Sequence, residues 1–201
     1  MARRITALIE KNLCIEKHKI QLTEKDIDLI ESSFKKFKVH KGECLIKKDE
    51  LEKYMYIVED GIFRYYTCNE IHQEDTFWFV VKDECLNPGC ILTDDTRSLF
   101  NIQALCESIV WGVHRDVLFN ICEESMAINS IKRILVEYFA KKQSKRLLLF
   151  KLPPKDRYLY LLENEKDLVQ QIPLKYLASY IGIASPSLSR IRNRLIKLSL
   201  L

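Results

Sequence analysis

The chain has 201 residues with 47% apolar and 30% charged side chains and a formal net charge of +4, which allows one or two domains with a real core. No segment approaches the roughly 18 consecutive apolar residues of a membrane helix, and Glu10 and Lys11 interrupt the N-terminal segment before a signal-peptide core. These features argue against a membrane protein or a membrane partner. The seven cysteines, odd in number and irregular in spacing, indicate reduced thiols and a cytoplasmic location.

Helices are predicted for residues 1–33, with a break near residues 21–23. Thr23 is expected to cap the second helix, with Asp26 in its first turn. Residues 34–113 instead hold short aromatic and β-branched runs, at 37–39, 54–58, 62–66, 76–81 and 109–113. Turn signals separate these runs at residues 41–43, 59–61 and 87–89. The segment is therefore predicted to form an antiparallel sandwich or barrel.

A short helix is expected at residues 115–122 and a long one from about residue 125 to 150. The long helix carries an apolar stripe at spacings of three and four, formed by Ile128, Ile131, Leu135, Tyr138 and Phe139. A second copy of the helix would cover this stripe and make a two-fold homodimer. The alternative is a helix that folds back on its own β domain. Pro153 and Pro154 end the helix and mark a hinge, and another helix is expected at residues 156–169.

The last thirty residues predict two short helices joined by a tight turn. The first helix has one apolar face, formed by Leu174, Leu177, Ala178 and Ile181, and Gly182 is expected to end it. Ser185 is expected to cap the second helix, with Pro186 at its first position. This helix has an inner apolar face at Leu188, Ile191, Leu195 and Leu198, and an opposite face at Ser187, Arg190, Arg194 and Lys197.

Charge supports a nucleic-acid partner for this helical pair. From Ile172 onward the chain has five basic residues and no acidic residue, so the positive charge of the protein is concentrated there. A helix-turn-helix places its second helix in the DNA major groove, and phosphate neutralisation by Lys and Arg supplies much of the affinity. We therefore predict binding to double-stranded DNA. The alternative is a helical hairpin with a solvated basic face.

The order of a β domain, a long helix and a C-terminal helix-turn-helix resembles the cyclic AMP receptor protein and FNR family of bacterial transcription regulators. The match is carried by residues 40–46, 56–61, 100–105 and 172–195, and glycines 42 and 61 match turn glycines of the family's β-roll. The resemblance implies an α+β fold with an antiparallel, cyclic-nucleotide-binding-like β-roll (a double-stranded β-helix). It also implies a central dimerisation helix and a C-terminal helix-turn-helix domain. The corresponding boundaries are 1–122, 123–151 and 152–201.

Carried over from the family, the base-reading positions fall on Ser185, Pro186, Ser189 and Arg190. Arg190 is suited to hold guanine O6 and N7 with two hydrogen bonds. Ser187 lies on the same outer face, and Arg192 and Arg194 are expected to contact phosphates, which position the protein without specifying sequence. The resemblance further implies a homodimer that reads two half-sites, with RNA polymerase as a further candidate partner.

The effector site departs from the family. Members that bind cyclic AMP carry a Gly-Glu pair for the ribose and an Arg-Ser or Arg-Thr pair for the phosphate. Residues 84–90 contain no Gly-Glu pair, and the aligned position of the phosphate arginine falls on Ser98, one residue after Arg97. We therefore expect that cyclic AMP does not bind in the usual way, with Arg97 and Ser98 as the candidate effector residues. The β-roll holds another small-molecule effector or none, and no cofactor or metal is assigned.

Three alternatives are a redox sensor of the same family, with an iron–sulfur cluster or haem, then an enzyme, and then a protein–protein adaptor. An iron–sulfur sensor needs closely spaced cysteines near the N-terminus, where only Cys14 lies, and the pair Cys85 and Cys90 is a poor cluster signal. A haem sensor would use His72. An enzyme could pair Cys106 with His114, but the sequence has no Gly-rich phosphate loop, HExxH or GxSxG motif, so no catalytic residue is assigned. A protein–protein adaptor that keeps the fold is the third alternative.

Overall fold

The computed structural model describes residues 3–13, 18–71, 73–86 and 97–197. Eight strands form two four-stranded antiparallel sheets with the orders β1-β8-β3-β6 and β2-β7-β4-β5. The strands are β1 (Lys35–Val39), β2 (Cys44–Ile46), β3 (Tyr54–Asp60), β4 (Ile62–Cys68), β5 (Glu74–Val81), β6 (Cys85–Leu86), β7 (Asn101–Ala104) and β8 (Ser108–His114). The predicted β-roll is therefore present, and all five predicted runs are strands. The short strands β2, β6 and β7 were not predicted.

Aromatic and branched side chains from both sheets fill the β-roll. Phe63, Val58, Ile102 and Val110 have no exposed surface, and Tyr56 and Tyr65 are also buried among them. The turn between β3 and β4 requires glycine at position 61 for two reasons. Its φ is +121°, and a Cβ there would lie 2.1 Å from Ser108 Oγ.

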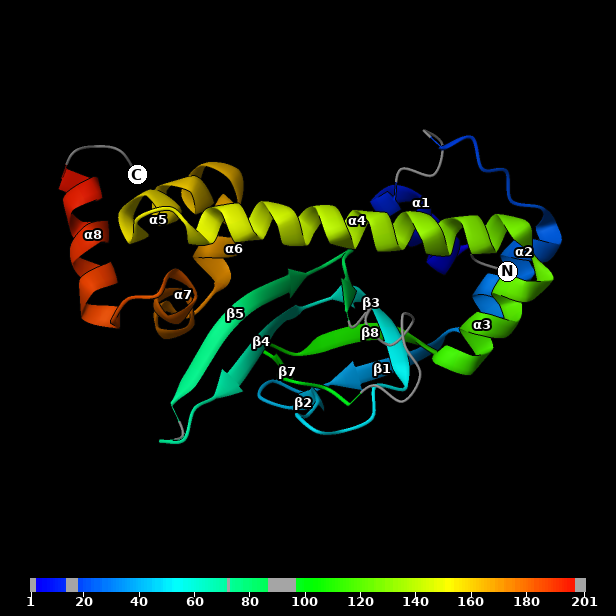
Figure 1. Ribbon diagram of the computed structural model, residues 1–201, viewed down its shortest axis with the longest axis horizontal. Helices are drawn as coiled ribbons and strands as arrows, with labels where there is room; N and C mark the ends of the chain where they lie inside the picture. The colour runs from blue at the N-terminus through cyan, green and yellow to red at the C-terminus, as the bar shows by residue number, and fades with distance from the viewer. Residues whose placement is uncertain (1–2, 14–17, 72, 87–96, 198–201) are drawn as a thin grey trace.

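The N-terminal helices behave as the capping pattern predicts. α1 (Arg4–Leu13) and α2 (Glu24–Ser33) precede the roll, and Thr23 and Asp26 form a capping box at the start of α2. After the roll come α3 (Arg115–Glu124) and the long helix α4 (Met126–Phe150), which Ser125 caps. Figure 1 shows α4 lying along the whole molecule above the roll, with α1, α2 and α3 near its start. The described helices include none with the length and apolar character that a membrane crossing requires.

Four helices follow α4: α5 (Pro154–Asn164), α6 (Lys166–Gln171), α7 (Leu174–Ile181) and α8 (Ser185–Lys197). The prediction of one helix over 156–169 is wrong, because the backbone leaves helical geometry at Glu165 (φ −141°, ψ 42°). Residues 151–197 are all described and contain no strand. These helices enclose a hydrophobic core of their own, separate from that of the roll, with Tyr158, Leu161, Ile181 and Leu188 at its centre. Phe79 of β5 also packs in this core.

Candidate nucleic-acid interface

The turn between α7 and α8 has the predicted glycine geometry. Gly182 lies in the left-handed region (φ +81°), and the Ile183 amide donates to the Ala178 carbonyl while the Gly182 amide donates to the Ser179 carbonyl. This pair of bonds is a Schellman motif, which satisfies the last carbonyls of α7. α8 begins at Ser185, since the Leu188 amide already donates to the Ala184 carbonyl. Ser185 is thus the first helical residue and not the predicted N-cap.

The predicted inner face of α8 is buried, and its outer face is open. Leu188 has no exposed surface and Leu195 only 2%, and Ile191 packs beside them. Of the predicted DNA-contacting residues, Pro186, Arg190 and Arg194 are exposed, whereas Ser185, Ser187, Ser189 and Arg192 are half-buried. Leu198 lies outside the described residues.

Sequence reasoning missed one residue of this open face. Asn193 is exposed and stands three residues after Arg190 and seven after Pro186, a spacing that puts all three on one side of the helix. The Arg190 Nε donates to the Pro186 carbonyl at 3.3 Å, so the guanidinium is held along the first turn of α8. An outer face with Arg and Asn side chains offers the two residue types that most often bind guanine and adenine with paired hydrogen bonds.

One buried arginine fixes the helical pair against the end of α4. Arg157 of α5, 9% exposed, donates to four carbonyls: Ile181 at 2.7 Å, Phe150 at 2.7 Å, Leu149 at 3.1 Å and Leu152 at 3.2 Å. These carbonyls end α4 and α7, where orphan acceptors and the helix dipoles both favour a cation. The predicted hinge at Pro153 and Pro154 is therefore bridged by hydrogen bonds.

α7 is docked on β5 of the roll by polar contacts. The Thr76 amide donates to Ser179 Oγ at 2.8 Å, and that hydroxyl donates to Asp75 Oδ1 at 3.1 Å. Figure 1 shows the β4–β5 hairpin extending toward α7. A cleft of about 830 Å³ lies between the hairpin end and the turn before α8, with Cys68 on one side and Ser185 on the other. The end of the hairpin thus faces the start of α8.

A second contact of the docked helix is a buried arginine of the roll. Arg64 of β4 is 1% exposed, donates to Glu74 at 2.6 Å and to Gln103 at 2.8 Å, and lies between two rings, Tyr66 at 4.0 Å and Tyr176 of α7 at 3.9 Å. A desolvated guanidinium over an aromatic face is held by cation–π attraction. The contact therefore couples the roll to the C-terminal helices.

The candidate effector residues are tied to their own chain. The Arg97 Nη1 donates to the Asp49 carbonyl at 2.8 Å, and Ser98, with no exposed surface, donates to the Phe100 carbonyl at 2.9 Å. Both residues lie beside the loop after β2, where the Asp49 amide donates to the Ser98 carbonyl. Among the described residues, neither side chain lines the cavities beside α4 or beside the C-terminal helices. Residues 87–90 of the aligned effector stretch, and the predicted turn at 87–89, lie outside the described residues.

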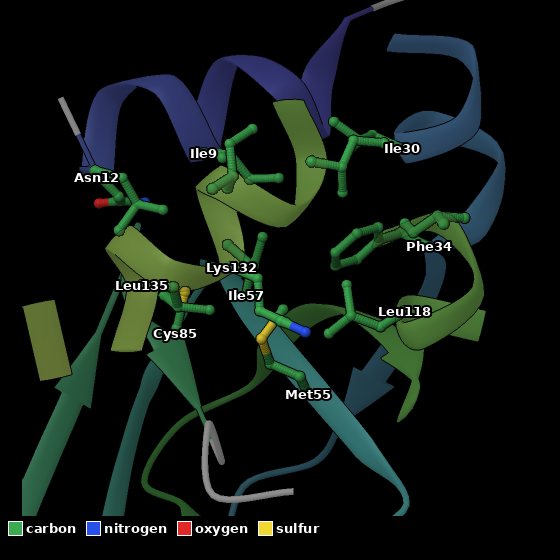
Figure 2. Close-up of a pocket in the computed structure, with 14 residues that line it drawn as sticks. Ile9, Asn12, Ile30, Phe34, Met55, Ile57, Cys85, Leu118, Lys132 and Leu135 are labelled. Carbon is green, nitrogen blue, oxygen red and sulfur yellow. The ribbon is translucent and has the colours of Figure 1, made fainter. Parts of the chain in front are cut away.

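The residues predicted to form the dimer seam are buried in their own chain. Ile128, Ile131 and Leu135 are 3–6% exposed and pack with α1, α2, α3 and β3, and Tyr138 and Phe139 are half-buried against the same core. Figure 2 shows Leu135 beside Cys85 and Ile57 at a small apolar cavity of about 40 Å³. These three isoleucine and leucine side chains are therefore not free for a dimer contact. The folded-back alternative covers this stripe, and the dimer itself stays a prediction.

The cysteine and histidine residues proposed for an enzyme, an iron–sulfur sensor or a haem sensor lie only partly within the described residues. Cys106 lies two residues before β8 and His114 is the last residue of that strand, which spans about 20 Å over its seven residues, so they form no nucleophile–base pair. Cys14, Cys90 and His72, on which the iron–sulfur and haem alternatives depend, lie outside the described residues. Within the described residues no three His, Cys, Asp or Glu side chains gather as a metal site would require.

Comparison with known proteins identifies the roll. Residues 36–125 match the family described as "Cyclic nucleotide-binding domain". No curated protein sequence matches the chain. Among solved structures, FixK2 from Bradyrhizobium japonicum is 17% identical with a TM-score of 0.71, covering 83% of this chain and 86% of that one.

Two further structures extend over most of both chains. The c-di-GMP responsive global regulator CLP of Xanthomonas campestris is 14% identical with a TM-score of 0.66, covering 89% of this chain and 94% of that one. A regulator of the crp/fnr family from Eubacterium rectale is 17% identical with a TM-score of 0.64, covering 87% and 83%. The predicted resemblance in fold is confirmed, and two of these three structures are described as regulators.

Proposed function

We propose that this chain, whose residues 36–125 belong to the cyclic nucleotide-binding domain family and whose fold is that of Crp/Fnr-type regulators, is a transcription regulator that binds double-stranded DNA as a homodimer. The observation that carries the proposal is the outer face of α8. Arg190, Asn193 and Arg194 are exposed there on a helix whose opposite face is packed through Leu188 and Leu195. Rigid presentation of donors on a basic helix is what major-groove recognition needs.

In this proposal Arg190 and Asn193 read base edges, because a guanidinium matches guanine and a carboxamide matches adenine. Ser185, Pro186, Ser187 and Ser189 lie at the N-terminal part of α8, which leads into the groove. Arg194 and the half-buried Arg192 contact phosphates and supply salt-dependent affinity.

The homodimer is proposed to form through the outward face of α4. At 100° per residue, this face lies opposite the buried stripe and includes Arg133, Glu137, Ala140, Ser144 and Leu147, all exposed. Leu147 and Leu148 are 67% and 65% exposed, unusual for leucine on a helix without a partner. In a parallel two-fold pair, Arg133 of each copy would lie near Glu137 of the other, as an isologous interface allows.

The β-roll is proposed to be a sensor that does not bind cyclic AMP in the usual way. Arg97 and Ser98 are already engaged by backbone groups, and the ribose-binding Gly-Glu pair is missing. A phosphate in that region would have to displace the hydrogen bond from Arg97 to Asp49. Any effector acts by binding the DNA-competent arrangement of the subunits better than the other arrangement.

The groove assignment is tested by two arginine substitutions on α8. Arg190→Ala should weaken binding to the selected sequence by about 1–3 kcal/mol and relax the preference at one base pair, and Arg194→Ala should weaken all sequences alike. Fluorescence anisotropy with specific and random duplexes at several salt concentrations measures both effects. Lys155→Ala, which removes an exposed cation from α5, is the matched control. Equal behaviour of Arg190→Ala on specific and random DNA would contradict the assignment.

The dimer face is tested by a charge on α4. Leu147→Asp should convert the dimer into a monomer in light scattering, because it places two carboxylates close together at the two-fold axis. Leu99→Asp is the matched control, since Leu99 is 74% exposed but lies before β7, far from α4 in the chain. A Leu147→Asp variant that remains dimeric would move the interface away from this face.

A further inference from the structure

A cavity of about 370 Å³, which no sequence pattern predicts, lies between β5, α4, α6 and α7. Its walls come from all three parts of the molecule: Trp78 and Phe79 from the roll, Arg146 from α4, and Leu168 and Tyr180 from the C-terminal helices. The volume falls within the range of small-molecule sites, at its lower end. A compound held there would contact the sensor, the connecting helix and the C-terminal helices at once.

Arg146 is the polar centre of this cavity. Its guanidinium lies 4.8 Å from the Trp78 ring, 5.1 Å from the Phe77 ring and 5.2 Å from the Phe150 ring. Its Nε is buried without a hydrogen-bond acceptor, and among the described residues no carboxylate pairs with it. Aromatic faces attract the cation but accept none of its in-plane N–H groups. Burial lowers the pKa of Arg146, yet an arginine stays charged in proteins.

The other charged groups of the cavity are already matched. Lys142 forms an ion pair with Glu84, and Lys145 is hydrogen-bonded to the Tyr160 hydroxyl. Glu165 also lines the cavity, where burial and the nearby Glu84 raise the pKa of its carboxyl and Lys142 and Lys145 oppose this rise. With three cations and two carboxylates, the site has room for one further negative charge. This balance favours a monoanion over a phosphate dianion.

We propose that this cavity binds a small organic carboxylate that carries one apolar ring, with Arg146 as the residue that holds the carboxylate. Arginine and carboxylate form two parallel N–H···O bonds in one plane, a pairing that the aromatic rings around Arg146 do not provide. The ring of the ligand would pack against Trp78 and Tyr180. The inference deepens the proposed function, because it names the effector class of the regulator and places the effector outside the Arg97-Ser98 region.

Calorimetry with three matched probes tests the site. Phenylacetate carries both the ring and the carboxylate, benzyl alcohol has the ring without the charge, and inorganic phosphate has the charge without the ring. We expect phenylacetate to bind the full chain with a Kd below about 1 mM, a modest affinity for a ligand of this size. Benzyl alcohol and phosphate should each bind at least about tenfold more weakly, since each lacks one of the two interactions.

Substitutions on α4 then identify the residue. Arg146→Gln should weaken phenylacetate binding by about tenfold or more, and Arg146→Lys should fall between, because an ammonium cannot make the planar pair of bonds. Lys141→Gln removes an exposed cation from the same helix outside the cavity and should leave binding unchanged. Thermal melts of each variant establish that it is folded. No phenylacetate binding to the wild type, equal binding to Arg146→Gln, or tighter binding of phosphate would each overturn the proposal.

DNA binding is measured separately so that the two ideas fail separately. If phenylacetate binds through Arg146 but no duplex is selected, the cavity stands and the regulator function fails. If a duplex is selected but phenylacetate does not bind, the regulator function stands and this effector site fails. If both hold, phenylacetate should change the DNA affinity of the wild type and leave that of Arg146→Gln unchanged.

Discussion

α7 contacts the roll through the Ser179 hydroxyl as well as through the Arg64–Tyr176 pair, and Ser179→Ala removes the first of these contacts. Ser179 Oγ accepts from the Thr76 amide at 2.8 Å and donates to Asp75 at 3.1 Å. Thr76 is only 2% exposed. In the variant its amide is therefore left in a buried place without its acceptor. Leaving a buried donor unsatisfied costs about 1–3 kcal/mol.

Hydrogen exchange of the Thr76 amide measures this cost locally. Since 1.4 kcal/mol is a factor of ten in an equilibrium constant, exchange of this amide should become roughly 5- to 150-fold faster in Ser179→Ala. Amides of β4 that pair within the sheet should change much less, because their acceptors remain. Ser187→Ala, a serine-to-alanine change on α8, is the matched control.

An unchanged exchange rate of the Thr76 amide in Ser179→Ala would contradict the role of Ser179 as its hydrogen-bond acceptor. It would mean that α7 does not lie on β5 in solution, so that the Arg64–Tyr176 contact would also be absent. Fast amide exchange throughout β5 and α7 in the wild type would also contradict the docking, since it would show that the roll and the C-terminal helices open independently of one another.

Three further predictions concern thiols, acid stability and the turn. Burial raises the pKa of Cys85 to about 12, so iodoacetamide at pH 8 should label the exposed Cys68 and spare Cys85 in native protein; equal labelling in mass spectrometry would contradict the burial. Hydrogen bonds from Ser125 and Thr23 lower the pKa of Asp26 from its ordinary 3.8, so this carboxylate stabilises the fold above that pH and the effect is lost as the pH falls through the folded-state pKa. Asp26→Asn should lower the urea midpoint of unfolding at pH 7, and the midpoint of the variant should decrease less than that of the wild type as the pH falls below about 4. An unchanged midpoint at pH 7 would contradict a stabilising role of the Asp26 carboxylate. Gly182→Ala should cost about 1–2 kcal/mol through left-handed strain alone, because its Cβ meets Arg157 only at 3.6 Å; a neutral thermal melt would contradict the φ of +81°.

The sequence predicts those parts of the fold in which local chemistry decides the structure. Aromatic and β-branched runs become β3, β4, β5 and β8 because such side chains suit a half-buried pleated surface. Thr23 and Asp26 fix the start of α2, and Gly182 ends α7, since each acts on backbone groups a few residues away. The outer face of α8 follows from the same helical spacing.

Long-range packing could not be read in the same way. The apolar stripe on α4 predicts that Ile131 and Leu135 are buried. It does not predict whether a second copy of the chain or the chain's own α1 and α2 cover them. The break between α5 and α6 at Glu165 could not be predicted, because neither glycine nor proline stands at or beside that position. Charged residues inside strands and helices, such as Arg64 and Arg146, give no sequence signal of burial, because their aromatic neighbours come from distant segments.

Selection of duplexes from a randomised pool by the wild-type chain tests whether it binds DNA as a homodimer. We expect enrichment of a two-fold symmetric sequence whose half-sites lie about one helical turn apart, because two copies of α8 would enter successive major grooves on one side of the duplex. Each half-site should contain a guanine whose preference disappears in Arg190→Ala. A pool that shows no enrichment, or one that yields a single asymmetric half-site, would contradict a DNA-binding homodimer.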